Sequence, residues 1–326
     1  MAAVTIVDLA SALGLSKTTV SDALIGSGRV SEETRKRVAD AAQAMGYVSN
    51  KAARSLRRRS MGAFGLYIPA YARALSFYMH FAFGAAAAAA AVGNDLTLHA
   101  NDAKQFHVDG AIVIDAMDDD PVVARMLDAS IPIVFAGPSG RALAPTLTVG
   151  TIEIDHARIV ARVLDALASE GTRRPGYIGM EASRRPGWAA ESQRAYDTWC
   201  ARAGVTSHRV ALTMNQREDE LFRAVEQLVN GGDVDALVIS PQGVAARVAS
   251  MLPQFGKRLA LKHEPGFHLA SLAGDPVGEL GSAQILAVDL EPKQFGQAAV
   301  ELLHEITTNP QPGHAHRFYQ PDFLAG

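Results

Sequence analysis

Apolar residues in the first fifty positions recur at the spacing of short α-helices. Ile6, Leu9, Ala10 and Leu13 share one helical face, and Thr5 before them is a residue type that caps helix N-termini well. The spacing therefore predicts a helix from about Ile6 to Leu13.

A sharp turn and a second helix follow in the pattern. Gly14 permits the turn, and Ser16 can cap a helix that directs Val20 and Leu24 inward. A glycine turn between two helices, the second opening on polar residues, is the geometry that places a helix N-terminus in the DNA major groove. A small helical bundle with an exposed polar face has the same pattern. The outward residues are Lys17, Thr18, Thr19, Ser21 and Asp22.

A third helix is expected to begin at Ser31 and to end at Gly46. Glu32 and Glu33 stand in its first turn, where the helix dipole favours acidic side chains. Its inward residues are Val38, Ala41, Ala42 and Met45. The first fifty residues thus predict an N-terminal all-α headpiece of the helix-turn-helix kind.

From Gly62 onward, short apolar runs alternate with helical stretches in two successive series. Alternation of this kind is typical of parallel sheets covered by helices, and two series indicate two similar subdomains. We therefore expect an α/β core of two doubly wound subdomains. The first spans roughly residues 61–155 plus part of the C-terminal region, and the second spans roughly 156–288.

One connection is short for this scheme. Only the nine residues 101–109 separate the expected strands 96–100 and 110–114, whereas a parallel crossover normally needs a dozen or more. Either the covering helix is missing and leaves one face of the first sheet uncovered, or the sequence lacks a stretch at this point. We favour the missing stretch.

Composition narrows the class of protein. The chain has 326 residues, 48% of them hydrophobic and 20% charged, which suits a multidomain globular protein. No apolar run is long enough to cross a bilayer and no secretory signal is visible, so we expect a cytoplasmic protein without a membrane partner. A single cysteine, Cys200, excludes an intramolecular disulfide framework and a cysteine-built zinc site.

Charge is distributed unevenly along the chain. Residues 1–60 hold 10 Lys and Arg against 5 Asp and Glu, while the remainder holds 21 against 29. The head therefore carries +5 and the body −8. A basic head on an acidic body suits a protein whose head approaches phosphates.

Specific residue runs in the head resemble the lactose-repressor (LacI) family of transcriptional regulators. The match is ungapped and rests on residues 4–10 (VTIVDLA), 15–21 (LSKTTVS), 30–31, 34–35, 45–47 and 50–56. In that family the second helix reads the major groove, which implies base-reading roles for Ser16, Lys17, Thr18, Thr19, Ser21 and Asp22. The resemblance also implies DNA contacts, mostly to phosphates, for Thr5, Ser31, Thr34, Tyr47 and Asn50.

One residue departs from the family pattern in the reading helix. Asp22 stands where the family usually has arginine. A carboxylate cannot donate a hydrogen bond to guanine but can accept one from cytosine. The substitution points to an unusual operator preference.

The segment from Asn50 to Arg59 resembles the family's hinge helix. In the family two such helices pair on DNA, and the residue matching Leu56 wedges into the minor groove while small Ala53 allows close approach. Arg54 belongs to the same expected DNA-contacting set. A basic, flexible linker is the alternative. The resemblance thus divides the chain into a DNA-binding domain (1–48), a hinge helix and linker (49–60), and an effector-binding and dimerisation core (61–326).

The body is similar to the family's periplasmic-binding-protein-like core, in which a small molecule binds in the cleft between subdomains. Landmarks are Phe77-Tyr78 with Gly84, residues 108–110, residues 131–132 and Asp155. Burial in the core or exposure in a loop is the alternative for each candidate cleft residue. The candidate effector-binding residues are Tyr71, Phe77, Trp188, Ser192, Arg194, Gln242 and Glu264.

Three departures concern this cleft. Ser192 stands where the family commonly has arginine, Ser240-Pro241-Gln242 replaces a run containing asparagine and aspartate, and residues 262–265 (KHEP) replace Gly-Phe-Asp-Asp. The family's residues bind sugar hydroxyls through charge-assisted hydrogen bonds. Their loss argues against an ordinary free sugar, and leaves an effector that is larger, more apolar or absent.

The expected function is sequence-specific transcriptional regulation, with repression the usual outcome in similar proteins. Two alternatives remain, a solute-binding protein of the same core fold without DNA activity, and an enzyme. The sequence has no P-loop, His-Glu-x-x-His or Gly-x-Ser-x-Gly motif, and we expect no cofactor. His314 and His316 are expected to be strand or tail residues rather than metal ligands, and residues 118–120 (DDD) a solvated loop, with a divalent cation as the alternative.

Two DNA half-sites require two heads, so a homodimer is the minimum assembly. Its interface is expected on the body, with residues 64–90 and the helix 294–306 as candidates. The apolar stripe of that helix is Phe295, Ala298, Ala299, Leu302 and Leu303. Ordinary packing against the sheet is the alternative for this stripe.

Overall fold

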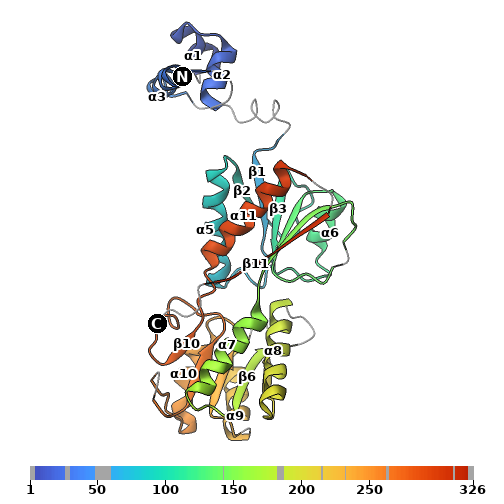
Figure 1. The fold of residues 1–326 in the computed structure, drawn as a ribbon, viewed down its shortest axis with the longest axis vertical. Coiled ribbons are helices and arrows are strands. Elements are labelled where there is room, and N and C mark those ends of the chain that lie inside the picture. Colours follow the sequence, from blue (N-terminus) through green and yellow to red (C-terminus); the bar gives the residue numbers. More distant parts are fainter. Residues whose placement is uncertain are drawn as a thin grey trace. The chain divides into compact units, whose positions relative to one another are not determined.

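The computed structural model describes residues 4–25, 30–47, 60–141, 143–181, 187–213, 216–231, 233–261, 264–310 and 313–321. The chain divides into two compact units, Met1–Met61 and Gly62–Gly326 (Figure 1). Each unit has its own apolar core.

The described residues of the N-terminal unit form the helices α1 (Ile6–Leu13), α2 (Lys17–Ile25) and α3 (Glu32–Ala44). Leu9, Val20 and Val38, one from each helix, are fully buried together at the centre of the unit. Gly14 ends α1 in the left-handed conformation (φ +63°), which a residue without a Cβ adopts at little cost. The predicted helical headpiece is confirmed.

The first sheet of the larger unit consists of six parallel strands in the order β11-β5-β4-β3-β1-β2. Helices α5 (Ser76–Ala91) and α11 (Pro292–Thr308) cover one face, and α6 (Pro121–Asp128) covers the other. The strands are β1 (Ala63–Tyr67), β2 (Asp95–His99), β3 (Gly110–Ile114), β4 (Ile133–Ala136), β5 (Thr148–Ile154) and β11 (Gly313–Tyr319).

The second sheet has five parallel strands in the order β10-β9-β8-β6-β7. Helices α7 (His156–Ser169) and α8 (Gly187–Ala203) pack on one face, and α9 (Glu218–Gly231), α10 (Val244–Met251) and the short η2 (Leu252–Phe255) pack on the other. The strands are β6 (Pro175–Met180), β7 (His208–Leu212), β8 (Ala236–Ile239), β9 (His268–Ser271) and β10 (Ile285–Ala287). The predicted α/β core of two doubly wound subdomains is confirmed.

The short connection after β2 closes without a helix. Strands β2 and β3 flank β1, so the chain must move about 10 Å sideways and about 10 Å back along the strands, and ten extended residues can span roughly 33 Å. The ring of Phe106 packs edge-on against His99 at 5.2 Å, and Nε of Arg125 in α6 donates to the carbonyl of Ala103 at 2.9 Å. These contacts place the connection on the α6 face. The given residues therefore span the gap without a covering helix, and the missing stretch stays a prediction.

Helices α5 and α11 cross at very short range. A methyl group on Gly84 would collide with the carbonyl oxygen of Lys293, and one on Gly296 would collide with the carbonyl oxygen of Phe81. Glycine at both positions lets the two backbones approach directly. The apolar stripe of α11 is buried in this core through Phe295, Ala299, Leu302 and Leu303, with Ala298 partly buried beside it. Its interpretation as core packing is confirmed, and its interpretation as a dimer interface is wrong.

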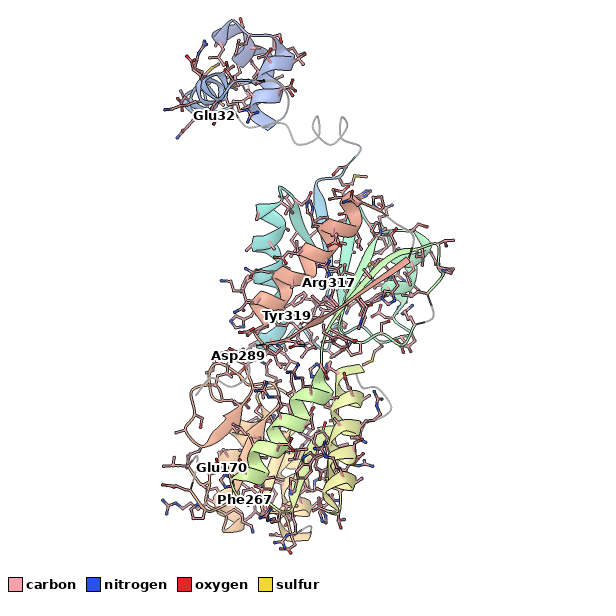
Figure 2. All side chains as sticks on the ribbon, in the orientation of Figure 1. Glu32, Glu170, Phe267, Asp289, Arg317 and Tyr319 are labelled. Atoms are coloured by element: carbon pink, nitrogen blue, oxygen red, sulfur yellow. The ribbon has the colours of Figure 1, made fainter. Side chains whose placement is uncertain are left out.

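Two described connections join the subdomains, from β5 to α7 and from β10 to α11. The hydroxyl of Tyr319, at the end of β11, donates to the carboxylate of Glu291 at 2.7 Å. This bond ties the edge strand of the first sheet to the second crossing segment. Tyr319 is labelled in Figure 2.

One carboxylate is fully buried in the second subdomain. Glu279 accepts hydrogen bonds from the Ser271 hydroxyl at 2.8 Å, from the Asp275 N–H at 3.0 Å and from the Ala246 N–H at 3.1 Å. It thereby joins β9, the loop after it and the start of α10. Burial of a charge is tolerated here because three donors face it.

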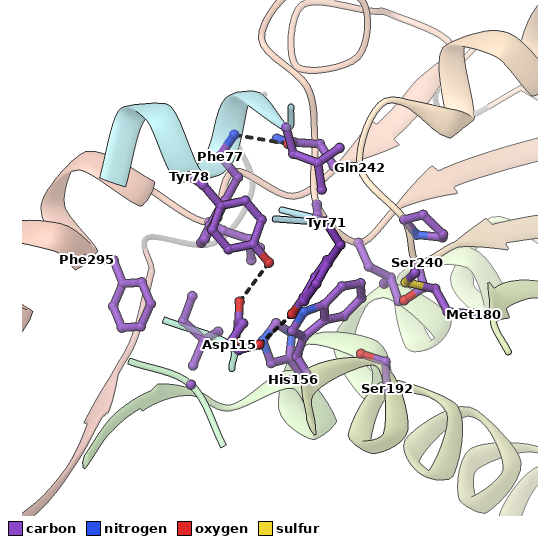
Figure 3. A pocket seen from close by; sticks show the side chains of 18 of the residues that line it. Tyr71, Phe77, Tyr78, Asp115, His156, Met180, Ser192, Ser240, Gln242 and Phe295 are labelled. Atoms are coloured by element: carbon purple, nitrogen blue, oxygen red, sulfur yellow. Dashed lines mark hydrogen bonds between the residues drawn. The ribbon is translucent and has the colours of Figure 1, made fainter. Parts of the chain in front are cut away.

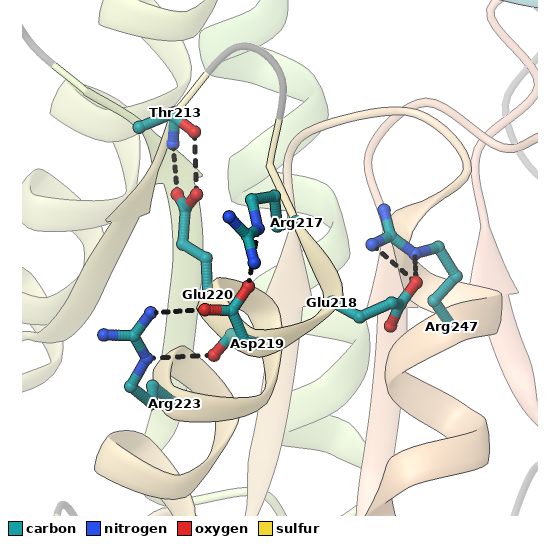
Figure 4. Close-up of polar contacts among 7 residues, drawn as sticks. All are labelled: Thr213, Arg217, Glu218, Asp219, Glu220, Arg223 and Arg247. Atoms are coloured by element: carbon teal, nitrogen blue, oxygen red, sulfur yellow. Dashed lines mark hydrogen bonds and ion pairs between the residues drawn. The ribbon is translucent and has the colours of Figure 1, made fainter.

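Polar residues organise the start of α9 (Figure 4). Glu220 accepts from both the backbone N–H and the hydroxyl of Thr213, at 2.6 and 2.7 Å. Glu218 pairs with Arg247 of α10 at 2.8 Å, and Asp219 pairs with Arg217 and Arg223. These charges therefore serve the surface packing of two neighbouring helices.

Candidate functional site

A cavity lies in the larger unit where the carboxyl ends of both sheets meet. Its empty space is about 920 Å³, including the part open to solvent. Asp115 directly follows β3, Met180 ends β6 and Ser240 directly follows β8, so the two subdomains contribute opposite walls (Figure 3). The carboxyl ends of parallel strands are where open α/β sheets bind ligands.

Aromatic side chains form much of the wall. Tyr71, Phe77, Tyr78, Trp188 and Phe295 all line the cavity. The rings of Phe77 and Tyr78 meet edge-on at 5.2 Å. Three of these residues, Tyr71, Phe77 and Trp188, were candidates from the sequence, and the structure brings them together.

Asp115 is the acidic residue of the cavity. Its Oδ2 accepts a hydrogen bond from the Tyr78 hydroxyl at 2.9 Å, and its backbone carbonyl accepts one from Tyr71 at 2.5 Å. Burial raises the pKa of Asp115 to about 7, although the Tyr78 hydrogen bond opposes the shift. A side chain at Gly137 would collide with Oδ1, so this glycine makes room for the carboxylate.

The other titratable groups in the cavity are neutral near pH 7. Burial lowers the pKa of His156 to about 4, and its ring lies 6.2 Å from that of Trp188. Burial also raises the pKa values of Tyr71 and Tyr78 well above 10. The ionisation state of the cavity near neutral pH therefore depends on Asp115.

Three further polar residues lie in the opposite wall. Ser192 is buried and lines the cavity, as does Gln242, so both sequence candidates are brought to the site. The Ser240 hydroxyl is also buried, and it finds no hydrogen-bond partner among the residues that the structure describes. A ligand that offers a donor or acceptor would satisfy this group.

Two hydrogen bonds join the subdomains beside the cavity. The N–H of Phe77 donates to Oε1 of Gln242 at 3.1 Å, and the hydroxyl of Ser76 donates to Asp275 at 2.8 Å. Both start at the N-terminus of α5. This helix end therefore fastens the first subdomain to the loops after β8 and β9.

Two sequence candidates do not line the cavity. Arg194 is exposed on α8, because two residues along a helix turn the side chain about 200° away from Ser192. Glu264 is exposed in the loop before β9. The sequence analysis missed Asp115, Tyr78 and His156. A polar residue directly after a buried strand was the available signal for Asp115.

The N-terminus of α2 presents a polar surface. Lys17 and Thr18 are exposed, and Thr19 and Asp22 are partly exposed. The Ser16 hydroxyl accepts from the Thr19 N–H at 3.0 Å and so caps the helix. Ser21 is only 8% exposed, so the expectation that it faces outward is wrong. It follows Val20 on the side of the helix that packs into the core.

The expected phosphate-contacting hydroxyls also cap helices. Thr5 and Asp8 form a reciprocal capping box at α1, with bonds of 2.8 and 3.3 Å. The Ser31 hydroxyl accepts from the Thr34 N–H at 3.3 Å and starts α3. Tyr47 is partly buried against the core. The remaining candidates lie outside the described residues, namely Asn50, Ala53, Arg54 and Leu56.

The described residues contain no group of three or more His, Cys, Asp or Glu side chains placed to hold a metal ion. None of the helices in this part of the chain combines the length and apolar character needed to cross a membrane.

Comparison with protein families matches two parts of the chain. Residues 5–50 match the family described as bacterial regulatory proteins, lacI family. Residues 164–324 match the periplasmic binding protein-like domain. The first match covers all three helices of the head, and the second covers much of the core.

Individual relatives are named as regulators. The maltose regulon regulatory protein MalI of Escherichia coli K12 is 30% identical over 195 residues, which is 55% of each chain. IpsA, a helix-turn-helix-type transcriptional regulator of Corynebacterium glutamicum, is 28% identical over 82% of this chain and 84% of its own. The chain spans about half the length of MalI in its match.

Solved structures share the fold. A crystal structure described as the lac repressor dimer bound to operator and the anti-inducer ONPF superposes with a TM-score of 0.72 over 97% of both chains, at 16% identity. Residues 5–50 are thus similar to the lacI family of bacterial regulatory proteins, and residues 164–324 are similar to periplasmic binding protein-like domains.

Proposed function

We propose that this chain is a transcriptional regulator whose head binds operator DNA and whose core binds a small molecule that controls it. One observation carries the proposal, a helix-turn-helix head on the same chain as an aromatic-lined cavity between two subdomains. The relatives are named as regulators, and the lac repressor structure is described as bound to operator and anti-inducer.

The DNA-reading surface in this proposal is the N-terminal half of α2. Lys17 and Thr18 are exposed there, and Thr19 and Asp22 lie beside them. The hydroxyls of Thr5, Ser16 and Ser31 cap the helix starts, and a hydroxyl that turns toward DNA can donate its hydrogen to a phosphate oxygen. Residues 1–48 form the DNA-binding domain, 49–60 the hinge and 61–326 the effector-binding and dimerisation core.

A homodimer is part of the proposal. Helix α5 packs beside the edge strand β2, and together they expose large apolar side chains. Met79 is 48% exposed, Phe83 is 60% exposed and Leu98 is 60% exposed. An apolar face of this kind is suited to a second copy of the chain, which would supply the second head for a two-half-site operator.

The two alternative functions receive less support. A solute-binding protein would have no use for a basic head that matches DNA-binding proteins. Enzymatic activity would need reacting groups, and we assign none, because the relatives are regulators and Asp115 is held by a tyrosine rather than by a base or nucleophile. We therefore propose that the core binds a ligand without transforming it.

A direct test is DNA binding by the full chain. An operator selected from a random double-stranded library is labelled, and anisotropy titrations are run from 50 to 200 mM salt. We expect affinity to fall steeply with salt because phosphate contacts release counterions. Lys17→Ala should weaken binding, whereas Arg202→Ala removes an exposed charge from the core and should not. A folded dimer that binds no DNA at 50 mM salt would refute the proposal.

A second test addresses the hinge, which lies outside the described residues. Leu56→Ala should weaken binding to the selected operator far more than binding to unrelated DNA, because minor-groove insertion acts only on a bent specific site. Equal losses on both DNAs would mean that the segment is only a linker.

A further inference from the structure

We infer that the ligand of the core cavity is a small organic cation, an amine or quaternary ammonium group on an apolar or aromatic body, with its charge at Asp115. This inference rests on the proposed effector function of the cavity and names its ligand class. Four features of the described cavity support it, the state of one carboxylate, the charges of the wall, the ring content and one unpaired hydroxyl.

The carboxylate of Asp115 has unused accepting capacity. Its Oδ2 receives one hydrogen bond, from Tyr78, and Oδ1 lies over Gly137 with no donor from the described residues. An ionised carboxylate can accept about four hydrogen bonds. Because these remaining lone pairs have no donor among the described residues, a ligand that brings N–H donors or a positive charge is favoured.

The rest of the described wall offers no positive charge. No lysine or arginine is among the described residues that line the cavity, and His156 is neutral near pH 7. Arg194, the cation expected there from the sequence, is exposed on α8. An anionic ligand would meet Asp115 without a counter-charge from this wall, whereas a cation would neutralise it.

The rings around Asp115 suit the same ligand. The Tyr78 hydroxyl donates to Oδ2 of Asp115 and the Tyr71 hydroxyl donates to its backbone carbonyl (Figure 3). Trp188 and Phe77 line the same cavity. A cation attracts the negative face of an aromatic ring, and the attraction grows when both are removed from water. The apolar body of the ligand would pack against the remaining rings.

A polar contact on the far wall completes the site. The buried, unpartnered Ser240 hydroxyl belongs to the second subdomain, and Asp115 belongs to the first. A ligand that reaches both groups would contact both subdomains at once. Its cationic end would lie at Asp115 and a hydroxyl, carbonyl or ether oxygen at Ser240.

The proposed pairing makes binding depend on pH. Burial raises the pKa of Asp115 to about 7, so binding strengthens as the carboxyl ionises. The groups that face it are Tyr78 from α5, Tyr71 from the segment after β1, and His156 from the start of α7, and none of these changes charge between pH 6 and 8. The ionised fraction, and with it the affinity for a cation, should rise about tenfold over that interval.

The test uses three probes that share one ring and differ in charge. Phenethylamine, 2-phenylethanol and phenylacetate are titrated into the full chain by isothermal titration calorimetry at pH 8, with benzyltrimethylammonium as a second cation. We expect the cations to bind at least tenfold more tightly than the alcohol and the anion to bind most weakly. Phenethylamine affinity should rise about tenfold from pH 6 to pH 8.

Two matched variants identify the group responsible. Asp115→Asn keeps the side-chain shape and should abolish both the preference for cations and the pH dependence. Asp119→Asn makes the same charge change at an exposed position four residues away and should leave both intact. Thermal melts confirm that each variant is folded.

Three results would overturn the inference. They are tighter binding of the alcohol or the anion, a cation preference that survives in Asp115→Asn, and no binding of either cation to the folded wild type. Operator binding is measured separately on the same protein. DNA binding without a cation preference would leave the proposed regulator intact and remove only this ligand class.

Discussion

The glycine contact between α5 and α11 leads to a quantitative prediction for Gly84→Ala. The added methyl carbon would lie 2.7 Å from the carbonyl carbon of Lys293 and closer still to its oxygen. Because the obstacle is backbone, no side-chain rotation relieves the collision, and the helices must separate. Overpacking of this kind costs about 1–3 kcal/mol, more than the helix-propensity gain of at most about 1 kcal/mol.

We therefore expect Gly84→Ala to lower the free energy of unfolding by about 1–2 kcal/mol, and Tm by roughly 2–8 °C for a unit of this size. Differential scanning calorimetry measures both quantities. Gly231→Ala is the matched control, since a Cβ at this exposed end of α9 meets nothing within 4 Å, and its Tm should stay level or rise slightly. A Tm for Gly84→Ala at or above the wild-type value would refute the close crossing.

Three further predictions follow from buried and exposed groups. Glu279→Ala leaves a hydroxyl and two backbone N–H groups without their acceptor, so urea unfolding should show a loss of about 3 kcal/mol, and Glu279→Gln a smaller one. Because burial raises the pKa of Asp115 to about 7, the folded core loses stability as pH rises from 4 to 7. Asp115→Asn removes this loss and should stabilise the ligand-free protein by up to about 4 kcal/mol at pH 8 and little at pH 4, and an equal effect at both pH values would contradict the assignment. Phe83→Glu should convert the proposed dimer to a monomer in light scattering, whereas persistence of the dimer would place the interface elsewhere.

The periodicity of apolar residues was sufficient to predict the helices of the head because these helices are short and are determined by nearby residues. The helix Ile6–Leu13 and the caps at Thr5, Ser16 and Ser31 all follow from residues within four positions of one another. Ser21 was wrongly predicted to face outward because the spacing of residues within one helix does not show how much of its side the neighbouring helices bury.

The cavity was only partly predictable because its members come from distant parts of the chain. Tyr71, Trp188 and Gln242 were candidates from the sequence, whereas the hydrogen bond between Asp115 and Tyr78 depends on the end of β3 lying against α5, which the sequence pattern does not show. Arg194 was wrongly predicted to line the cavity, because it lies two residues after Ser192 and therefore on a different side of α8. From the sequence, the apolar stripe on α11 could be either core packing or a dimer interface, since an apolar face alone does not show what packs against it.

The two chain crossings between the subdomains impose an order on folding during synthesis. Every strand of the second sheet lies between residues 175 and 287, in one continuous stretch, so that subdomain is complete when the ribosome has delivered it. The first sheet begins earlier in the chain but is completed later. It needs α11 to cover one face and β11, at residues 313–319, to pair with β5. The nascent chain therefore holds β1 to β5 without α11 on a face that α5 covers only in part, until residues 292–319 emerge. A ribosome-stalled chain ending near residue 290 should consequently expose apolar surface that the finished protein buries.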